Sequence, residues 1–124
     1  MKHLKQDKGY NCTQTCLAMM SNKSIREVEN IVGHDESMDI VMDVINTCEK
    51  LNIPVDEGWV DIKPNLIYSH FYPSNCFVFV RNRCNRLNGH MIVRYNNKFY
   101  DPNGMTYRFL LRRYIFMAYL EIRK

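Results

Sequence analysis

The chain has 124 residues, 46% of them hydrophobic, which suits one ordinary domain with its own core and leaves no room for a second. Its 17 basic and 13 acidic residues give a net charge of +4 and are spread along the chain, without the clustered basic stripe that nucleic-acid binding requires. We therefore expect a single domain over residues 1–124 and no nucleic-acid partner.

Nothing in the sequence indicates export or membrane insertion. The N-terminus has no apolar stretch of signal-peptide length, and no stretch approaches the roughly 20 apolar residues that cross a bilayer. The five cysteines cannot all pair with one another and lack the short repeated spacing of a disulfide scaffold. These features predict reduced thiols, a cytoplasmic location and no membrane partner.

The first predicted element is a helix that begins near residue 12. Asn11 is a candidate N-cap, and Gln14 follows three residues later, which is the spacing of a capping box. The run 16–20, CLAMM, is apolar nearly all round. Such a pattern indicates a buried helix.

Two further helices are expected before residue 52. In SIREVENIVG, Ser24 and Glu27 have capping-box spacing, apolar residues recur at helical intervals, and Gly33 ends the helix. The third runs from about Ser37 to about Leu51, and a proline soon after stops it. Cys48 lies on its apolar stripe, so we expect this cysteine in the core.

The second half of the chain has the pattern of strands. The continuous apolar run 76–80 indicates a strand buried on both faces. Segments 90–95 and 98–101 flank two asparagines, which suits a tight hairpin. The run 114–122 is long enough for a strand or a helix, and its aromatic residues favour a strand. Helices followed by a mostly antiparallel sheet predict the α+β class.

Cys12 is the cysteine best placed to act as a nucleophile. In the first turn of a buried helix, a thiol meets unpaired backbone N–H groups and the positive end of the helix dipole, and both favour the thiolate. The alternative is a small core residue. That description suits Cys16, Cys48 and Cys76 better.

A thiolate nucleophile usually needs an imidazole beside it. Of the four histidines, we expect three at the surface: His3 in a frayed terminus, His34 after a helix end and His70 in an irregular stretch. His90 differs, because it opens the first strand of the predicted hairpin.

The hairpin register places a carboxylate near His90. If Asn96-Asn97 is the turn, Ile92 faces Asp101, and His90 is the diagonal neighbour of Asp101 on the same face, with Cβ atoms about 7–8 Å apart or somewhat less. Asp101 would then hold the imidazole in one tautomer, as in a catalytic triad. The alternative is a lone histidine beside an aspartate that caps the turn DPNG.

Hydrolysis of an amide or thioester also creates an oxyanion, which needs hydrogen-bond donors. The side-chain amide of Gln6 and the backbone N–H of Cys12 are candidates. A glutamine near a terminus is otherwise unremarkable, so this hypothesis depends on its spacing from Cys12.

These residues together resemble the papain-like cysteine peptidases. More narrowly, Gln6, Cys12 at the head of a helix that ends CLAMM, and the stretch GHMIVRYNNKFYDPNG look like the group that trims bacteriocin leader peptides and its stand-alone relatives. That group's pattern is a Gln, a DCG..CL.M helix start, a GH.vv strand and a following DP..G. The resemblance implies the papain-like fold and a role for each matching residue: Cys12 as nucleophile, His90 as general base and acid, Asp101 as orienting carboxylate, Gln6 as oxyanion donor and Cys16 as the structural second cysteine.

The chain also departs from that group. Asp-Cys-Gly reads Asn11-Cys12-Thr13 here, and the β-branched Thr13 can crowd the substrate carbonyl. The chain has no transporter segment or nucleotide-binding motif, so the resemblance does not imply leader processing during export. Other relatives of this fold deamidate glutamine or modify host proteins with the same three groups.

The sequence therefore predicts a thiol hydrolase, a cysteine peptidase or amidase that acts on a peptide or protein substrate without a cofactor. Glutamine deamidation stays open as its reaction. The alternative is a weak or inactive papain-like fold that serves as a protein-binding effector, viral or from a mobile element. A metal site of Cys76, Cys84 and His90 is a third hypothesis, but these residues lack a close CxxC pair, and we expect no metal.

Overall fold

The computed structural model describes residues 1–9, 11–34, 38, 43–63, 72–85, 89–104 and 113–123. Within these ranges the chain forms helices first and strands afterwards, which confirms the predicted α+β class. The elements are α1 (Cys12–Ser21), α2 (Ile25–Val32), α3 (Asp43–Lys50), β1 (Val60–Asp61), β2 (Cys76–Asn82), β3 (Gly89–Tyr95), β4 (Lys98–Tyr100) and β5 (Tyr114–Glu121). No helix in the described part of the chain has the length and apolar character needed to cross a membrane.

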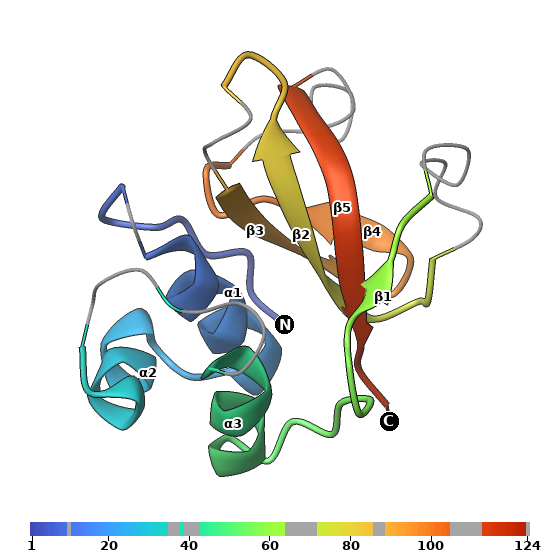
Figure 1. The fold of residues 1–124 in the computed structure, drawn as a ribbon. Coiled ribbons are helices and arrows are strands. Elements are labelled where there is room, and N and C mark those ends of the chain that lie inside the picture. The colour runs from blue at the N-terminus through green and yellow to red at the C-terminus, as the bar shows by residue number, and fades with distance from the viewer. Residues whose placement is uncertain are drawn as a thin grey trace.

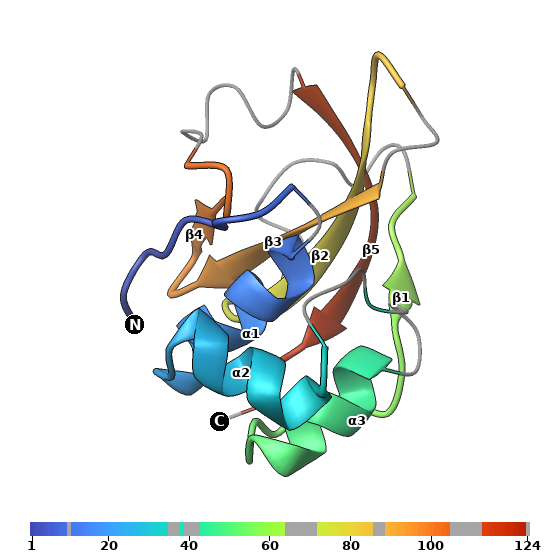
Figure 2. The same ribbon diagram turned by 90° about the vertical axis from the view of Figure 1, so that its left-hand side faces the viewer.

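Helix α1 is buried, as its apolar sequence predicts. Every side chain from Thr13 to Met19 is removed from solvent. The helix contacts both α2 and β3, and Figures 1 and 2 show it between α2 and the sheet. Its N-terminal end is therefore held in place from two sides.

The capping box predicted at the start of α1 is wrong. Asn11 occupies the N-cap position, but its side chain accepts no hydrogen bond from the helix. Its backbone angles, φ −106° and ψ 31°, are not the extended ones that aim a capping side chain at the first turn. Instead, Asn11 Nδ2 donates to Asp7 Oδ1 at 2.6 Å, and Asn11 Oδ1 accepts from the Lys8 backbone N–H at 3.2 Å. Gln14 is fully buried.

Helix α2 begins and ends as predicted. Ser24 Oγ accepts from the Glu27 backbone N–H, and Glu27 Oε1 accepts from the Ser24 backbone N–H, both at 3.1 Å. Gly33 ends the helix with φ 94°, a left-handed conformation that glycine adopts without strain. In the third predicted helix, Cys48 is fully buried as expected, while the predicted start near Ser37 lies outside the described residues.

The strands form one antiparallel sheet in the order β1-β5-β2-β3-β4. The predicted strand at 76–80 is the central β2, and the run 114–122 is a strand, as its aromatic content indicates. Asn96 and Asn97 have φ 48° and 67° and form the hairpin turn, so Tyr95 pairs with Lys98 as predicted.

The sheet has an apolar cluster on each face. Alternate residues of β2 and β3 point to opposite sides, so that Phe77 and Val93 pack with the helices while Val78 and Ile92 pack in the second cluster. Figures 1 and 2 show the three helices gathered on one side of the sheet. His90, two residues before Ile92, starts β3 on the side of the second cluster.

Strand β5 contains one residue more than its partner β2 along their shared ladder. Phe79 pairs with Ala118, but the next residue, Val80, pairs with Phe116, so Met117 forms a β-bulge. An extra residue moves the following side chains to the other face of the sheet. Accordingly, Leu120 packs on the helix side, whereas Tyr114 lies in the second cluster.

The N-terminal segment runs along the loop that follows β4. The Gln6 backbone N–H donates to Pro102 O at 2.8 Å, and His3 Nε2 donates to Asp101 O at 2.8 Å. The expectation of a frayed terminus around His3 is therefore wrong, although this side chain is exposed as predicted. Contacts between segments 98 residues apart leave no local pattern in the sequence.

Candidate active site

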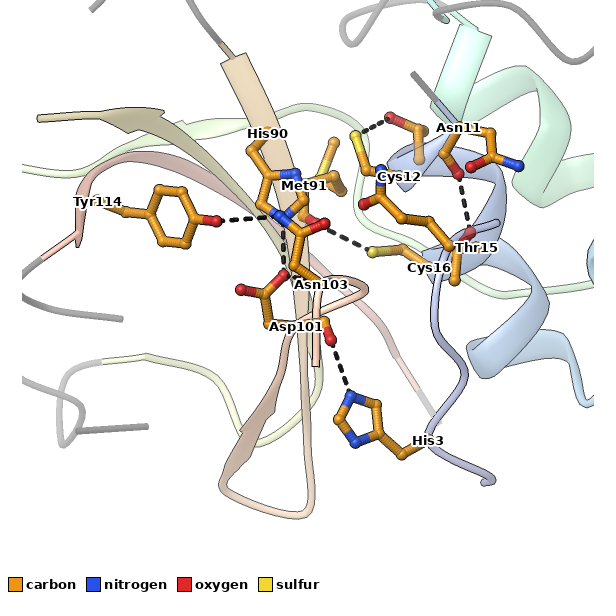
Figure 3. Close-up of polar contacts among 12 residues, drawn as sticks. His3, Asn11, Cys12, Thr15, Cys16, His90, Met91, Asp101, Asn103 and Tyr114 are labelled. Carbon is orange, nitrogen blue, oxygen red and sulfur yellow. Dashed lines mark hydrogen bonds and ion pairs between the residues drawn. The ribbon is translucent and has the colours of Figure 1, made fainter. Parts of the chain in front are cut away.

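Helix α1 and the β3–β4 hairpin, which are distant from each other in sequence, bring Cys12, His90 and Asp101 together. Cys12 is the first residue of α1, His90 is the second residue of β3, and Asp101 follows the last residue of β4. Figure 3 shows the His90 ring between the sulfur of Cys12 and the carboxylate of Asp101. The arrangement is that of a nucleophile, a base and an orienting acid.

The hairpin explains how His90 meets Asp101. The pairs Tyr95–Lys98 and Val93–Tyr100 have the predicted register, and Asp101 directly follows the last paired residue of β4. His90 Nε2 donates to Asp101 Oδ1 at 2.7 Å. The Asp101 side chain is 0% exposed and that of His90 is 11% exposed, so little water competes for this bond.

Cys12 is partly buried, and Figure 3 shows its sulfur on the side of the His90 ring that faces α1. Burial raises the pKa of Cys12, but the hydrogen bond and the charge of His90 lower it, with help from the Met91 backbone. The pKa of Cys12 is therefore lowered below its ordinary value. A depressed pKa is the mark of a reactive rather than a structural cysteine.

The pKa of His90 moves in the opposite direction. Burial lowers it, but hydrogen bonds to Asp101 and Cys12 and the charges of both residues raise the pKa of His90 to about 9. Because the Cys12 pKa falls while the His90 pKa rises, the thiolate–imidazolium pair is favoured over the neutral pair. Because Nε2 of His90 is hydrogen-bonded to Asp101, the other ring nitrogen, Nδ1, is the one that can interact with Cys12.

Two residues that the sequence analysis did not single out complete the surroundings of this pair. The Asn103 backbone N–H donates to Asp101 Oδ1 at 2.9 Å, and Asn103 Nδ2 donates to the Tyr114 hydroxyl at 3.3 Å. The Tyr114 ring stacks on His90 with centroids 5.2 Å apart and an interplanar angle of 23°. The turn DPNG could have indicated Asn103, but Tyr114 comes from a distant strand and has no motif.

Gln6 lies between the Asp101 loop and the head of α1. Its backbone N–H donates to Pro102 O, and the next two residues are tied to Asn11. Gln6 Nε2 donates to Lys8 O at 2.7 Å, which uses one of its two hydrogens, and Gln6 Oε1 is buried without a hydrogen-bond partner. The second Nε2 hydrogen is the one that could bind an oxyanion.

Thr13 and Cys16 flank the nucleophile along α1. Thr13 Oγ1 lies 4.0 Å from Cys12 Sγ, so the β-branched side chain after Cys12 contacts the sulfur. Cys16 Sγ donates to Met91 O at 3.3 Å, and burial raises the pKa of Cys16 well above its ordinary value. Cys16 is thus a neutral thiol that joins α1 to β3.

Of the residues that the structure describes, Cys48, Cys76, Cys84 and His34 do not join the site, and His3 reaches only the backbone carbonyl of Asp101. Burial raises the pKa of Cys48 and of Cys76 to about 12, which makes both inert, and Cys84 is an exposed free thiol. His34 is exposed, and His70 lies outside the described residues. Among the residues that the structure describes, no three His, Cys, Asp or Glu side chains are arranged to hold a metal ion, and the hypothetical set Cys76, Cys84 and His90 forms no such group.

No family model matches this chain, and no curated protein or solved structure matches it either.

Proposed function

We propose that the protein is a thiol hydrolase with a papain-like fold, a cysteine peptidase or amidase that acts on a peptide or protein. The observation that carries this proposal is the continuous arrangement of Cys12, His90 and the buried Asp101, with opposite pKa shifts on the thiol and the imidazole. A structural cysteine needs neither an imidazole beside it nor a carboxylate behind that imidazole.

The proposed reaction uses protein groups and water. The Cys12 thiolate attacks the carbonyl carbon of the substrate amide and forms a tetrahedral oxyanion. The free backbone N–H of the first helical turn and the Gln6 side-chain amide stabilise that oxyanion. His90 then gives its Nδ1 proton to the leaving amine, and the C–N bond breaks to leave an acyl-thioester on Cys12.

The second half of the reaction restores the enzyme. Neutral His90 takes a proton from water as the water oxygen attacks the thioester carbonyl, and the C–S bond breaks to release a carboxylic acid. Cys12 leaves as a thiolate beside the imidazolium. Asp101 stays ionised and holds Nε2 throughout. The same steps on a glutamine side chain release ammonia, so peptide cleavage and deamidation share one site.

The proposal predicts that Cys12 reacts selectively with a thiol alkylator. At pH 7 we expect iodoacetamide to modify Cys12 about tenfold or more faster than the exposed Cys84, since the thiolate fraction rises tenfold for each unit by which the pKa falls. Mass spectrometry of peptides from a time course gives both rates in one sample. The His90→Ala variant should bring the two rates together.

Equal rates at Cys12 and Cys84 in the unmodified protein would overturn the activated thiol. A peptide library incubated with the protein then separates the reactions, because cleavage shortens a peptide while deamidation changes only the mass of glutamine. The Cys12→Ala variant should abolish either product, and the Cys84→Ser variant should leave it unchanged.

A second candidate function is a protein-binding effector with an idle site. The observation that favours it is the buried Thr13, whose hydroxyl contacts Cys12 Sγ where the family has a glycine. In that case the Cys12→Ala variant would retain the whole biological effect of the protein. Loss of that effect with retained folding would favour the hydrolase.

A further inference from the structure

We propose that Tyr114 and Asn103 form a positioning pair that keeps the imidazole of His90 and the carboxylate of Asp101 in their productive arrangement. This inference rests on the proposed thiol hydrolase. Neither residue is assigned a part in the chemical steps, so both act through the groups that they touch.

The ring of Tyr114 fixes the plane of the imidazole. It stacks on His90 at 5.2 Å with an angle of 23° between the planes, and Figure 3 shows it on the side of His90 away from Cys12. A stacked ring leaves the imidazole free to accept and release protons in its own plane, but opposes its rotation out of that plane. Rotation would break the bond of His90 to Asp101 and turn the other ring nitrogen away from Cys12.

The hydroxyl of Tyr114 fixes the carboxylate through Asn103. Asn103 Nδ2 donates to the Tyr114 hydroxyl, while the Asn103 backbone N–H donates to the same Asp101 oxygen that accepts from His90. Burial is the largest influence on Tyr114 and raises the pKa of its hydroxyl, so the group stays protonated at neutral pH and bears no charge against Asp101. The turn is thereby tied to β5.

Burial strengthens the hydrogen bond between His90 and Asp101. Tyr114 is 2% exposed and stacks on His90, and the carboxylate that His90 contacts is itself 0% exposed. Water excluded from a charged hydrogen bond cannot screen it, so the bond between His90 and Asp101 is stronger under the ring than it would be in the open.

The β-bulge at Met117 is the reason that Tyr114 can reach His90. Strand β2 lies between β5 and β3 in the sheet, so a side chain from β5 contacts His90 only if it lies on the same face and extends over β2. Without the extra residue, Tyr114 would share the face of Leu120, on the side of the helices. Bulges next to active sites re-aim side chains in this way.

The test compares two leucine variants of the same strand. Tyr114→Leu removes the ring from His90, whereas Tyr119→Leu removes a ring of the same cluster that packs on Tyr72 and serves as the matched control. We expect Tyr114→Leu to slow the alkylation of Cys12 by iodoacetamide at pH 7 about tenfold, because a displaced imidazole favours the thiolate less, and Tyr119→Leu to leave it within about twofold. Equal rates in the two variants would overturn the proposal.

Conservative variants distinguish the contribution of the Tyr114 ring from that of its hydroxyl. They also remain informative if the Tyr114→Leu variant does not fold. Tyr114→Phe and Asn103→Ala each break the bond between Asn103 and the hydroxyl. We therefore expect equal and smaller losses, of about twofold, and no further loss when both changes are combined, because they remove one interaction. A Tyr114→Phe variant as slow as Tyr114→Leu would overturn the role given to the ring.

A signature of His90 itself distinguishes failure of this inference from failure of the proposed function. In the Cys12→Ala background, the imidazole Nε2–H held by Asp101 should give a proton NMR signal that exchanges slowly with water. Tyr114→Leu should abolish that signal and Tyr119→Leu should retain it. If the NMR signal persists in Tyr114→Leu, the positioning role of Tyr114 is wrong. If the signal is lost as expected but Cys12 of the natural sequence is unreactive, only the proposed hydrolase function is wrong.

Discussion

At the scale of single residues, the properties of the site depend on which of three neighbouring side chains, those of Cys12, His90 and Asp101, carry protons. Cys12 and His90 shift their pKa values in opposite directions because each stabilises the charge of the other, and the buried carboxylate of Asp101 adds to the effect on His90. Removal of His90 therefore changes the titration of Cys12, and removal of Cys12 or Asp101 changes that of His90. Thr13 adds a hydroxyl contact to Cys12 Sγ.

The titration of His90 predicts the alkaline limit of activity. Its imidazole is protonated below its pKa of about 9 and neutral above it, and only the protonated form can donate to a leaving amine. Hydrolysis should therefore fall as the pH rises through about 9, whereas alkylation of Cys12, which needs only the thiolate, should not fall. The pH profiles of the two reactions on one preparation test this difference.

The Asp101→Asn variant should move that limit downwards. It keeps an oxygen to accept from His90 but removes the charge that raises the His90 pKa, so this pKa should fall toward its ordinary value of about 6.5. NMR titration of the His90 ring in the natural sequence and in the variant measures the shift directly. An unchanged His90 pKa in this variant would contradict the coupling.

At the scale of elements, local patterns in the sequence predict those features that neighbouring residues determine. The capping box of α2, the buried α1 and the hairpin with its Asn96-Asn97 turn all follow from residues a few positions apart. The hairpin register in turn predicts the meeting of His90 with Asp101. The roles of these residues in catalysis stay predictions.

Other features of the site could not be predicted because they depend on distant segments. The bulge in β5 is set by its pairing with β2, and nothing in the run 114–122 indicates which residue is extra. Asn11 has the residue type and spacing of a helix cap, yet its side chain bonds to the preceding loop. The spacing of residues in the sequence indicates which groups a side chain can bond to. Competition among those groups in the folded chain determines which bond forms.

Helix α2 offers a prediction about stability at this scale. Ser24→Ala removes the acceptor for the Glu27 backbone N–H and should lower the free energy of unfolding by about 1 kcal/mol. Ser21→Ala is the matched control, since Ser21 Oγ only donates to a carbonyl within α1, at 3.4 Å. Urea denaturation of the two variants measures both changes, and equal losses would contradict the capping role.

At the scale of the whole molecule, the N-terminal segment and the Asp101 loop stabilise each other. His3 Nε2 and the Gln6 backbone N–H donate to the consecutive backbone carbonyls of Asp101 and Pro102. Met1 and Leu4 pack against the apolar cluster that the helices form with the sheet. The segment that carries the oxyanion candidate is thus joined to the loop that carries the carboxylate.

Gly104 provides a test of this junction. Its φ of 79° lies in the left-handed region, and an added Cβ would lie 2.7 Å from Cε of Lys5. Since the end of a lysine side chain can move, the backbone strain should dominate, and Gly104→Ala should cost about 1–2 kcal/mol. Gly58→Ala meets nothing within 4 Å and should be close to neutral. Thermal unfolding compares the two.

The wide separation of Cys12, His90 and Asp101 along the chain has a practical consequence. In the unfolded chain these groups are independent, and Cys12 becomes an ordinary thiol with the modest reactivity of any other cysteine. Its alkylation rate therefore reports the assembled tertiary structure, and a fluorescent electrophile at neutral pH would label native molecules at one position and so count them within a mixed population.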